Sequence, residues 1–209
     1  MEEIRGNKKI HYFWPQVLQE ENIGVKQELL DYVKTLEYIR VKQDNGSVSK
    51  NHDILDDEIF KELKETIIDR TKFYLQDLYS QNPFELEIIA SWVMKHKKGD
   101  FAQAHYHHNS YMSGVYYLQS DEKSGKINFI KNDQEDKLSP TIKPDVYRWN
   151  DINGAIHWSK VTPGNLLIFP SRLVHDTDTN ESDMNRYCLA WNIMPKGKIG
   201  EKDHKWHIK

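Results

Sequence analysis

A change in sequence character at residues 82–83 constrains the fold more than any other feature. Before it, apolar residues recur at three- and four-residue steps from Val25 to Leu36 and from Phe60 to Leu78, the period of one helix face. After it, short apolar and β-branched runs alternate with Gly, Pro, Ser and Asn. A helical block followed by many short strands predicts an α+β protein whose helices pack on one side of a β-sandwich or barrel.

The expected strands cover residues 86–94, 111–119, 126–130, 166–169 and 187–194, with a less regular candidate at 156–161. Asp56 and Asp57 precede the second helical run and are of the type that caps helix N-termini. Residues 42–52 are polar and contain Asn45-Gly46, which predicts a loop. Residues 131–153 have little pattern and many charges, which predicts a surface loop or a lid.

The length of 209 residues fits one domain, and no composition shift argues for two. We expect residues 1–209 to form a single domain, with helical support at about 14–82, a β core at about 84–195 and a polar tail at 196–209. The tail carries His204 and His207, but we expect a solvated chain end there rather than a metal site.

Charge and cysteine content narrow the classes of partner and compartment. The net charge of -3 gives no electrostatic reason to expect a nucleic-acid partner. The one cysteine, Cys188, excludes an internal disulfide and fits a reducing compartment. There is no signal-like apolar run and no stretch approaching the ~18–20 apolar residues of a membrane span. The expectation is a soluble cytoplasmic protein with no membrane partner.

Two histidines two residues apart form the first candidate site. His105 and His107 would project from the same face of a strand. They would chelate a metal if a third ligand arrived from another strand, and neutral imidazole suits Fe(II), Zn(II), Cu and Ni alike. The alternative is that the pair is a polar strand surface.

A second group of candidates lies near the end of the chain. His175 follows the apolar run at 166–170, and Arg186 begins the final strand eleven residues later. Alternation divides this strand into two faces, Arg186, Cys188, Ala190 and Asn192 on one and Tyr187, Leu189, Trp191 and Ile193 on the other. The bulky face should meet the helices. The face with one cation among small or polar neighbours suits a small anion, because Arg offers a carboxylate two parallel hydrogen bonds. The alternative for Arg186 is a surface salt bridge.

Taken in order, these motifs resemble the 2-oxoglutarate/Fe(II) oxygenase family, whose relatives include the prolyl hydroxylases. The resemblance runs from about Phe13 to Pro195 and rests on His-x-His at 105–107, Ser113–Leu118, Gly125–Phe129, Gly164–Pro170, His175 and Arg186. It implies a double-stranded β-helix, or jelly roll, with packing helices from the N-terminal third. It also implies that His105, His107 and His175 hold Fe(2+).

The resemblance further implies roles around the iron. Arg186 would bind the C5 carboxylate of the cosubstrate 2-oxoglutarate, assisted by Tyr117, which shares its face with Val115 and Gln119. Strand register decides whether Tyr116 or Tyr117 faces the pocket, and either could instead serve sheet packing. Asp176 and Asn192 are candidates to orient the ligating histidines.

One position departs from the family pattern. The usual ligand set is two histidines and one carboxylate, and His107 occupies the carboxylate position. Three neutral ligands leave the full charge on the metal, which could alter metal preference. His108 is an alternative ligand, although its side chain should lie on the opposite face from His105.

The expected function is therefore a non-haem Fe(II) dioxygenase that couples oxidative decarboxylation of 2-oxoglutarate to hydroxylation of an unidentified substrate. No side-chain general base is expected. Residues 131–153 and the loop at Asn45 would border the substrate pocket, and Trp149 and Trp158 would be either substrate contacts or packing aromatics. The alternatives are a cupin-like three-histidine metalloenzyme that does not use 2-oxoglutarate, which would not need Arg186, and a non-catalytic jelly-roll binding module, which would not retain metal.

Overall fold

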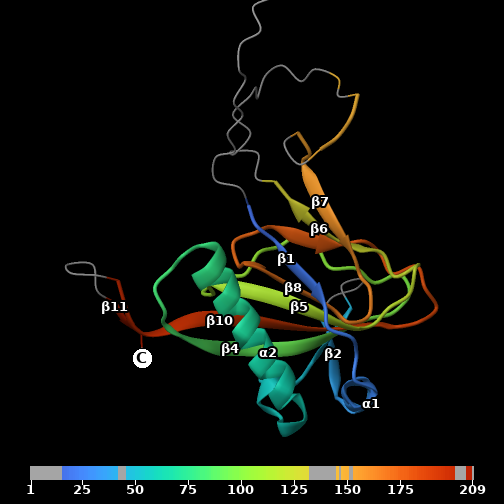
Figure 1. Ribbon diagram of the computed structural model, residues 1–209. Helices are drawn as coiled ribbons and strands as arrows, with labels where there is room; N and C mark the ends of the chain where they lie inside the picture. The colour runs from blue at the N-terminus through green and yellow to red at the C-terminus, as the bar shows by residue number, and fades with distance from the viewer. Residues whose placement is uncertain are drawn as a thin grey trace, which may run out of the picture.

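The fold is described from a computed structural model that places residues 16–41, 46–131, 145, 147–150, 153–200 and 206–208 (Figure 1). Its helical segments are α1 (Gln27–Thr35), the single turns η1 (Ile54–Asp56) and η2 (Glu58–Phe60), α2 (Lys61–Lys72) and a π-helical continuation η3 (Phe73–Leu78). None of the helices in these ranges is long and apolar enough to span a membrane.

The other regular elements of the described residues are β-strands. They are β1 (Gln19–Asn22), β2 (Tyr38–Arg40), β3 (Ser47–Ser49), β4 (Glu85–His96), β5 (Met112–Gln119), β6 (Lys126–Ile130), β7 (Ile156–Lys160), β8 (Asn165–Pro170), β9 (His175–Thr177), β10 (Arg186–Ile199) and β11 (Trp206–Ile208). The bounds of β4 to β8 lie close to those expected from the sequence.

Two antiparallel sheets face each other. The larger has the order β1-β8-β5-β10-β4-β3-β2, with β11 on β10, and the smaller has the order β7-β6-β9. All pairs between the named strands are antiparallel. This sheet-rich architecture with few helices fits the expected jelly roll.

The larger sheet separates two hydrophobic clusters. The helix-side cluster joins α1 and α2 to the outer face of the sheet, and Figure 1 shows α2 crossing in front of β4 and β10. The intersheet cluster fills the space between the two sheets and contains Val115, Tyr117, Ile127, Phe129, Val161, Leu167, Phe169 and Cys188. Tyr187, Leu189, Trp191 and Ile193 belong to the helix-side cluster, so the alternation predicted for the final strand is confirmed.

The first third of the chain is less helical than expected. β1 pairs with the edge of β8, and the β2–β3 hairpin pairs with β4. Strands of three or four residues are too short to display a period, and their stability comes from the sheet edge they extend. Asp57 does occupy the N-cap position of η2, which leads into α2, but its side chain makes no capping bond and accepts a hydrogen bond from Tyr32 Oη at 2.8 Å. The capping role expected for Asp56 is wrong, because Asp56 lies inside η1.

The boundary expected at residue 196 falls inside a strand. β10 continues to Ile199, pairing Lys196 with Glu85, and its end pairs with β11. Trp206 and His207 are exposed, as expected, but they belong to a β ladder rather than to a free chain end. Phe13, residues 42–45, most of the segment 131–153, and His204 lie outside the described residues.

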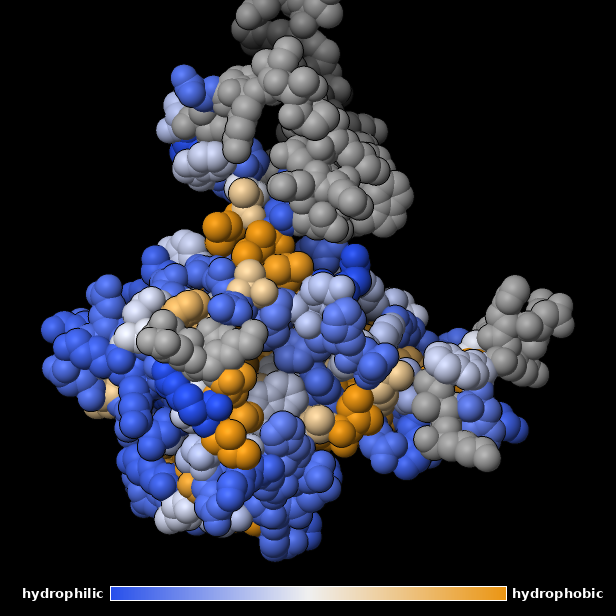
Figure 2. Space-filling view, turned by 180° about the vertical axis from the view of Figure 1, so that it is seen from behind, coloured by the Kyte–Doolittle hydropathy of each residue, from blue (hydrophilic) through white to orange (hydrophobic). Residues whose placement is uncertain are grey.

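The face seen from behind is mostly hydrophilic, with small separate apolar areas (Figure 2). Trp149 and Trp158 are 61% and 48% exposed, so neither is a packing aromatic of the core. Lys126 Nζ lies 4.0 Å from the centre of the Trp158 ring, across the β6–β7 pair.

Candidate metal centre

The three predicted histidines come together in space, with His175 buried, His107 half-buried and His105 exposed. His105 and His107 lie in the segment that joins β4 to β5, and His175 begins β9. The strand expected around the His-x-His pair is not formed, since His105 makes only an isolated bridge and His107 lies outside any strand. A two-residue bridge ties these segments together, with His105 N–H donating to His175 O at 3.0 Å and His175 N–H donating to His105 O at 2.9 Å. One ring nitrogen from each histidine lies within 4.8 Å of the other two, so the cluster is close enough to share one metal ion.

Backbone carbonyls orient two of the three rings. His105 Nδ1 lies 2.6 Å from Gln103 O, and His175 Nδ1 lies 2.8 Å from Leu173 O. A ring that donates from Nδ1 presents Nε2 as its lone-pair nitrogen, which is the arrangement that metal-binding histidines adopt. In both cases the supporting carbonyl belongs to the residue two positions before the histidine.

Burial keeps the deeper rings neutral. The pKa of His175 is lowered to about 3, first by burial and then by the neighbouring His105. The pKa of His107 is lowered to about 4 for the same two reasons. Phe169 and Phe129 pack against His175, with ring centres 4.9 and 6.2 Å away. A metal ligand must be a neutral imidazole, because a protonated ring has no lone pair to donate. The two neutral rings therefore suit a divalent cation.

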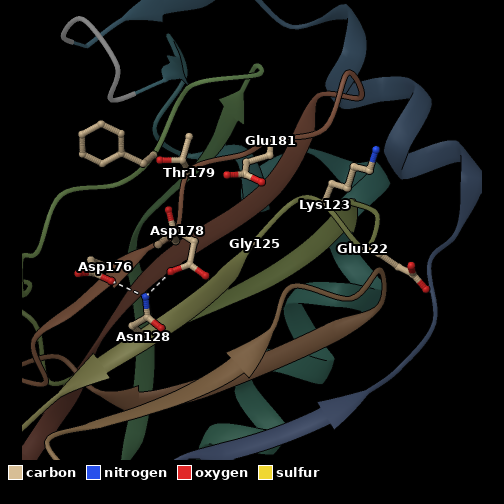
Figure 3. A pocket seen from close by; sticks show the side chains of 10 residues that line it. Glu122, Lys123, Gly125, Asn128, Asp176, Asp178, Thr179 and Glu181 are labelled. Atoms are coloured by element: carbon tan, nitrogen blue, oxygen red, sulfur yellow. Dashed lines mark hydrogen bonds between the residues drawn. The ribbon is translucent and has the colours of Figure 1, made fainter.

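The two candidate orienting residues differ in their contacts. Asn192 Oδ1 accepts a hydrogen bond from Ser113 Oγ at 2.8 Å, and Ser113 Oγ lies 2.8 Å from Ser171 Oγ. Ser171 O in turn accepts from His107 N at 2.9 Å, so Asn192 is linked to the histidine segment through two serines. Asp176 faces an outer pocket instead, where Asn128 Nδ2 bridges it to Asp178 at 2.9 and 2.8 Å (Figure 3).

Arg186 lies inside the molecule, not in a surface salt bridge. It is 0% exposed. Its Nη1 donates to Ser124 O at 2.6 Å and Asp178 O at 3.2 Å, and its Nη2 donates to Thr177 Oγ1 at 2.8 Å. Its Nε has no hydrogen-bond partner in the part of the chain that the structure describes. Of the guanidinium donors, Nε–H and one N–H of Nη2 are left without an acceptor among the described residues. Nε and Nη2 form one edge of the guanidinium, and such an edge can bind a carboxylate through two parallel hydrogen bonds. No described carboxylate forms an ion pair with it.

The register places Tyr117 beside Arg186. Tyr117 pairs with Cys188 and belongs to the intersheet cluster, whereas Tyr116 pairs with Leu189 and donates its hydroxyl to Gly24 O at 2.7 Å on the helix side. Burial first, and then Cys188, raises the pKa of Tyr117, against an opposing effect of Arg186. Burial also raises the pKa of the Cys188 thiol to about 11. Both groups are therefore neutral hydrogen-bonding partners in this space.

Two residues of the interior escaped prediction from sequence. The Thr177 hydroxyl accepts hydrogen bonds from Arg186 Nη2 and from Ala102 N. The sequence feature that could have indicated this residue is its position two residues after His175, on the same face of β9. His96 pairs with Arg186 in the β4–β10 ladder and is 2% exposed. The strand expected at 86–94 stopped two residues before His96, so its position opposite Arg186 was hidden.

The chain is similar to known proteins in sequence and in fold. Residues 90–192 match the model of a family described as "Putative 2OG-Fe(II) oxygenase". No curated protein matches the chain. The solved structure of a prolyl-4-hydroxylase from Pseudomonas putida is similar at a TM-score of 0.56 and 11% identity, covering 85% of this chain and 92% of that chain.

Two further solved structures share the fold. HygX from Streptomyces hygroscopicus, with nickel, 2-oxoglutarate and hygromycin B bound, has a TM-score of 0.58 and 13% identity, covering 86% of this chain and 83% of that chain. The viral collagen prolyl hydroxylase from Paramecium Bursaria Chlorella virus-1, in complex with 2-oxoglutarate, has a TM-score of 0.52 and 13% identity, covering 84% of this chain and 94% of that chain. At these identities the likeness shows the fold, and the expected resemblance is confirmed.

Proposed function

We propose that this chain, which over residues 90–192 matches the 2OG-Fe(II) oxygenase family, is an Fe(II) dioxygenase that decarboxylates 2-oxoglutarate to hydroxylate an unidentified substrate. The cofactor is Fe(2+), and the cosubstrates are 2-oxoglutarate and dioxygen. His105, His107 and His175 would hold the iron, because their ring nitrogens converge within 4.8 Å.

The observation that carries the proposal is the open fork of Arg186. A fully buried cation without an anionic partner is costly, and breaking such a pair costs several kcal/mol, about 3–5 in measured cases. Nε–H has no acceptor among the described residues. A carboxylate supplies the missing charge and the missing acceptors at once. The residues therefore fit the distal carboxylate of 2-oxoglutarate.

Bound iron and 2-oxoglutarate supply the oxidising chemistry, in which dioxygen is consumed and succinate is released. The chain's own residues bind and orient. Arg186 and the neutral Tyr117 hydroxyl hold the distal carboxylate, and the carbonyls of Gln103 and Leu173 keep two histidine rings in place. The aromatic and aliphatic side chains of the intersheet cluster exclude water from the same space.

The helices of the first third support the sheet that carries Arg186. We infer one domain over residues 1–209, in which the helices of the first third brace the larger sheet. The contact that supports this role is the helix-side cluster, where Leu29, Val33 and Ile67 pack with Leu189 and Trp191. Bracing that face holds β10, and with it Arg186, at a constant distance from the histidines.

Anaerobic calorimetry of the iron-loaded protein with 2-oxoglutarate tests the proposal. We expect binding by the wild type and at least a ~30-fold loss in Arg186→Met, since truncating one partner of a buried charge pair costs about 2–5 kcal/mol. Lys198→Met is the matched control, an exposed cation on the same strand. Iron content should be unchanged in both variants. Iron-loaded protein without affinity for 2-oxoglutarate, or an Arg186→Met variant that binds normally, contradicts the proposal.

A second function has one observation in its favour. Among the described residues, the metal cluster consists of three imidazoles without a carboxylate, which also suits a three-histidine metalloenzyme that does not use 2-oxoglutarate. The two functions differ in one product. Succinate formed in step with 2-oxoglutarate consumption supports the first, and substrate oxidation without succinate supports the second. A binding module without catalysis would retain no iron after purification.

A further inference from the structure

His96 and Arg186 enter the same interior space from neighbouring strands. His96 is the last residue of β4, and its partner in the antiparallel ladder is Arg186. Side chains of such partners stand on the same face, with Cβ atoms about 4.5–5.5 Å apart. The next pair along that face is Met94 with Cys188, and Cys188 belongs to the intersheet cluster. The imidazole therefore lies beside the guanidinium on the interior side of the sheet.

Both side chains carry buried nitrogens without partners. Among the residues that the structure describes, Nδ1 and Nε2 of His96 and Nε of Arg186 have no hydrogen-bond partner. The residues are 2% and 0% exposed. Buried polar atoms are hydrogen-bonded in about nine cases out of ten, so three orphaned nitrogens in one cross-strand pair need an explanation. The explanation must supply acceptors, because the free Arg186 nitrogen can only donate.

The surroundings of His96 decide which edge of its ring is open. A Cβ at Gly46 would lie 2.7 Å from His96 Cδ2 and 3.0 Å from Nε2, so the chain at Gly46 covers that edge. The opposite edge carries Nδ1. The charged groups near the ring are Arg186, Asp100 and Arg40, and Arg40 is already paired with Asp100 at 2.6 Å. Burial first, and then Arg186, lowers the pKa of His96 to about 3, so the ring is neutral and has one N–H to donate.

We propose that His96 is a positioning residue for the cosubstrate, donating a hydrogen bond from its interior-facing ring nitrogen to the same distal carboxylate that Arg186 binds. This inference rests on the proposed function. A carboxylate has about four lone-pair sites, enough for the two donors of the Arg186 fork, the Tyr117 hydroxyl and one imidazole N–H. The neutral ring adds a donor without a second positive charge, so the subsite keeps one cation for one carboxylate.

Two substitutions separate hydrogen bonding from packing. His96→Leu removes the donor at similar volume, and His96→Gln keeps an N–H donor. Titration of anaerobic, iron-loaded protein with 2-oxoglutarate should show affinity about tenfold or more weaker in His96→Leu, the range of a hydrogen bond to a charged group, and within about threefold of the wild type in His96→Gln. Pyruvate, a 2-oxo acid with no distal carboxylate, should bind all three proteins equally.

Thermal unfolding without cosubstrate adds an independent measurement. Because His96→Leu removes two orphaned buried nitrogens, its ligand-free midpoint should equal or exceed that of the wild type. A purely structural role predicts the reverse, a lower midpoint with equal losses for 2-oxoglutarate and pyruvate, and that result overturns the inference. So does His96→Leu with wild-type affinity for 2-oxoglutarate.

The unaltered protein provides a test that does not depend on the folding of a variant. In Zn(II)-loaded protein with ¹⁵N-labelled histidine, the imidazole resonances of His96 should shift when 2-oxoglutarate is added, and unchanged resonances overturn the inference. The two proposals fail differently. If Arg186→Met loses binding while His96→Leu does not, only the role of His96 is wrong. If the wild type itself does not bind 2-oxoglutarate, the proposed function is wrong.

Discussion

At the scale of single residues, the three histidines are not equally constrained. The rings of His105 and His175 are each held by a carbonyl two residues earlier, at 2.6 and 2.8 Å. The His107 ring has no such bond to any residue in the described ranges and instead lies 5.7 Å from the Trp92 ring, centre to centre. By the resemblance described from the sequence, His107 also takes the position at which the usual ligand set has a carboxylate. It is therefore the ligand whose chemistry can change with least disturbance.

We predict that His107→Asp keeps iron and supports 2-oxoglutarate turnover at or above the wild-type rate, because a carboxylate ligand restores the usual facial set. Metal content measured by mass spectrometry and succinate measured by NMR provide the check. His105→Asp is the control and should lose iron, since its ring is fixed through Gln103. A His107→Asp protein that purifies without iron would show that all three imidazoles are needed.

Asp100 is a residue through which the free energy of unfolding should depend on pH. Its carboxylate accepts from Arg40 Nη1 and Nη2 at 2.7 and 2.6 Å and is 4% exposed. Burial would raise its pKa, but the hydrogen bonds from Arg40 and from Lys97 N outweigh it, so the pKa is lowered. A group with a lowered folded-state pKa stabilises the fold above its unfolded pKa, and this stability is lost as the pH falls through the folded value.

We therefore expect Asp100→Asn to cost about 1–3 kcal/mol at neutral pH, the cost of a lost hydrogen bond to a charged group. The difference from the wild type should shrink below about pH 4, near the unperturbed pKa of Asp. Urea unfolding at several pH values measures it. Asp183→Asn, in an exposed pair with Lys98, is the control and should change little. A constant difference between Asp100→Asn and wild type at every pH would refute the linkage.

At the scale of elements, the contact between β5 and β10 leaves no room at one position. Gly114 pairs with Trp191, whose ring is fully buried. A Cβ at Gly114 would lie 2.3 Å from Trp191 Cζ2 and 2.6 Å from Leu167 O, the latter on β8. Three neighbouring strands therefore approach one another over a residue without a side chain. The close approach lies on the face of the sheet that carries the helix-side cluster, to which Trp191 belongs.

Gly114→Ala should lower the free energy of unfolding by about 1–3 kcal/mol, the usual cost of overpacking a core. Denaturant unfolding measures the loss. Adding Trp191→Phe removes the ring atoms nearest to the new methyl group. The double variant should therefore lose less free energy of unfolding than the sum of the losses in the two single variants. If the two losses add exactly, the steric clash of the new methyl group is with Leu167 O and not with the indole of Trp191.

At the scale of the whole molecule, the histidine cluster connects the two sheets. His105 and His107 follow β4 of the larger sheet, and His175 belongs to β9 of the smaller sheet. A metal ion bound by all three links both sheets in the native state and has no equivalent site in the unfolded chain. Metal binding should therefore stabilise the entire fold.

We predict that removing the metal with a chelator lowers the thermal midpoint and that Fe(II) or Zn(II) restores it. At free metal about a hundredfold above the dissociation constant, the expected stabilisation is about 2.7 kcal/mol. Differential scanning calorimetry of wild type and His175→Ala measures it. The variant should show no metal-dependent shift, and an equal shift in both proteins would place the metal elsewhere.

Residues with strong local patterns were predicted best. The β-type runs after residue 83 became β4 to β8 and β10, and the alternation of the final strand separated Arg186 and Cys188 from Tyr187 and Trp191. The strands β1, β2 and β3 were missed because three or four residues carry no period, and they form only on edges that other strands provide. His96 was missed for a related reason, since its importance depends on a partner ninety positions away.

The sequence by itself determined which side chains could bind a metal and an anion, because the types and spacing of His105 and His107 and the alternation around Arg186 can be read without the fold. The strand expected at the histidine pair is not formed, although the ring nitrogens still converge with that of His175. Only the tertiary structure decided that these groups share one space. The pairing of His105 with His175, and of Arg186 with His96, joins segments distant in the chain. Such contacts depend on sheet register, which is set by burial of the whole set of apolar faces and not by any local motif.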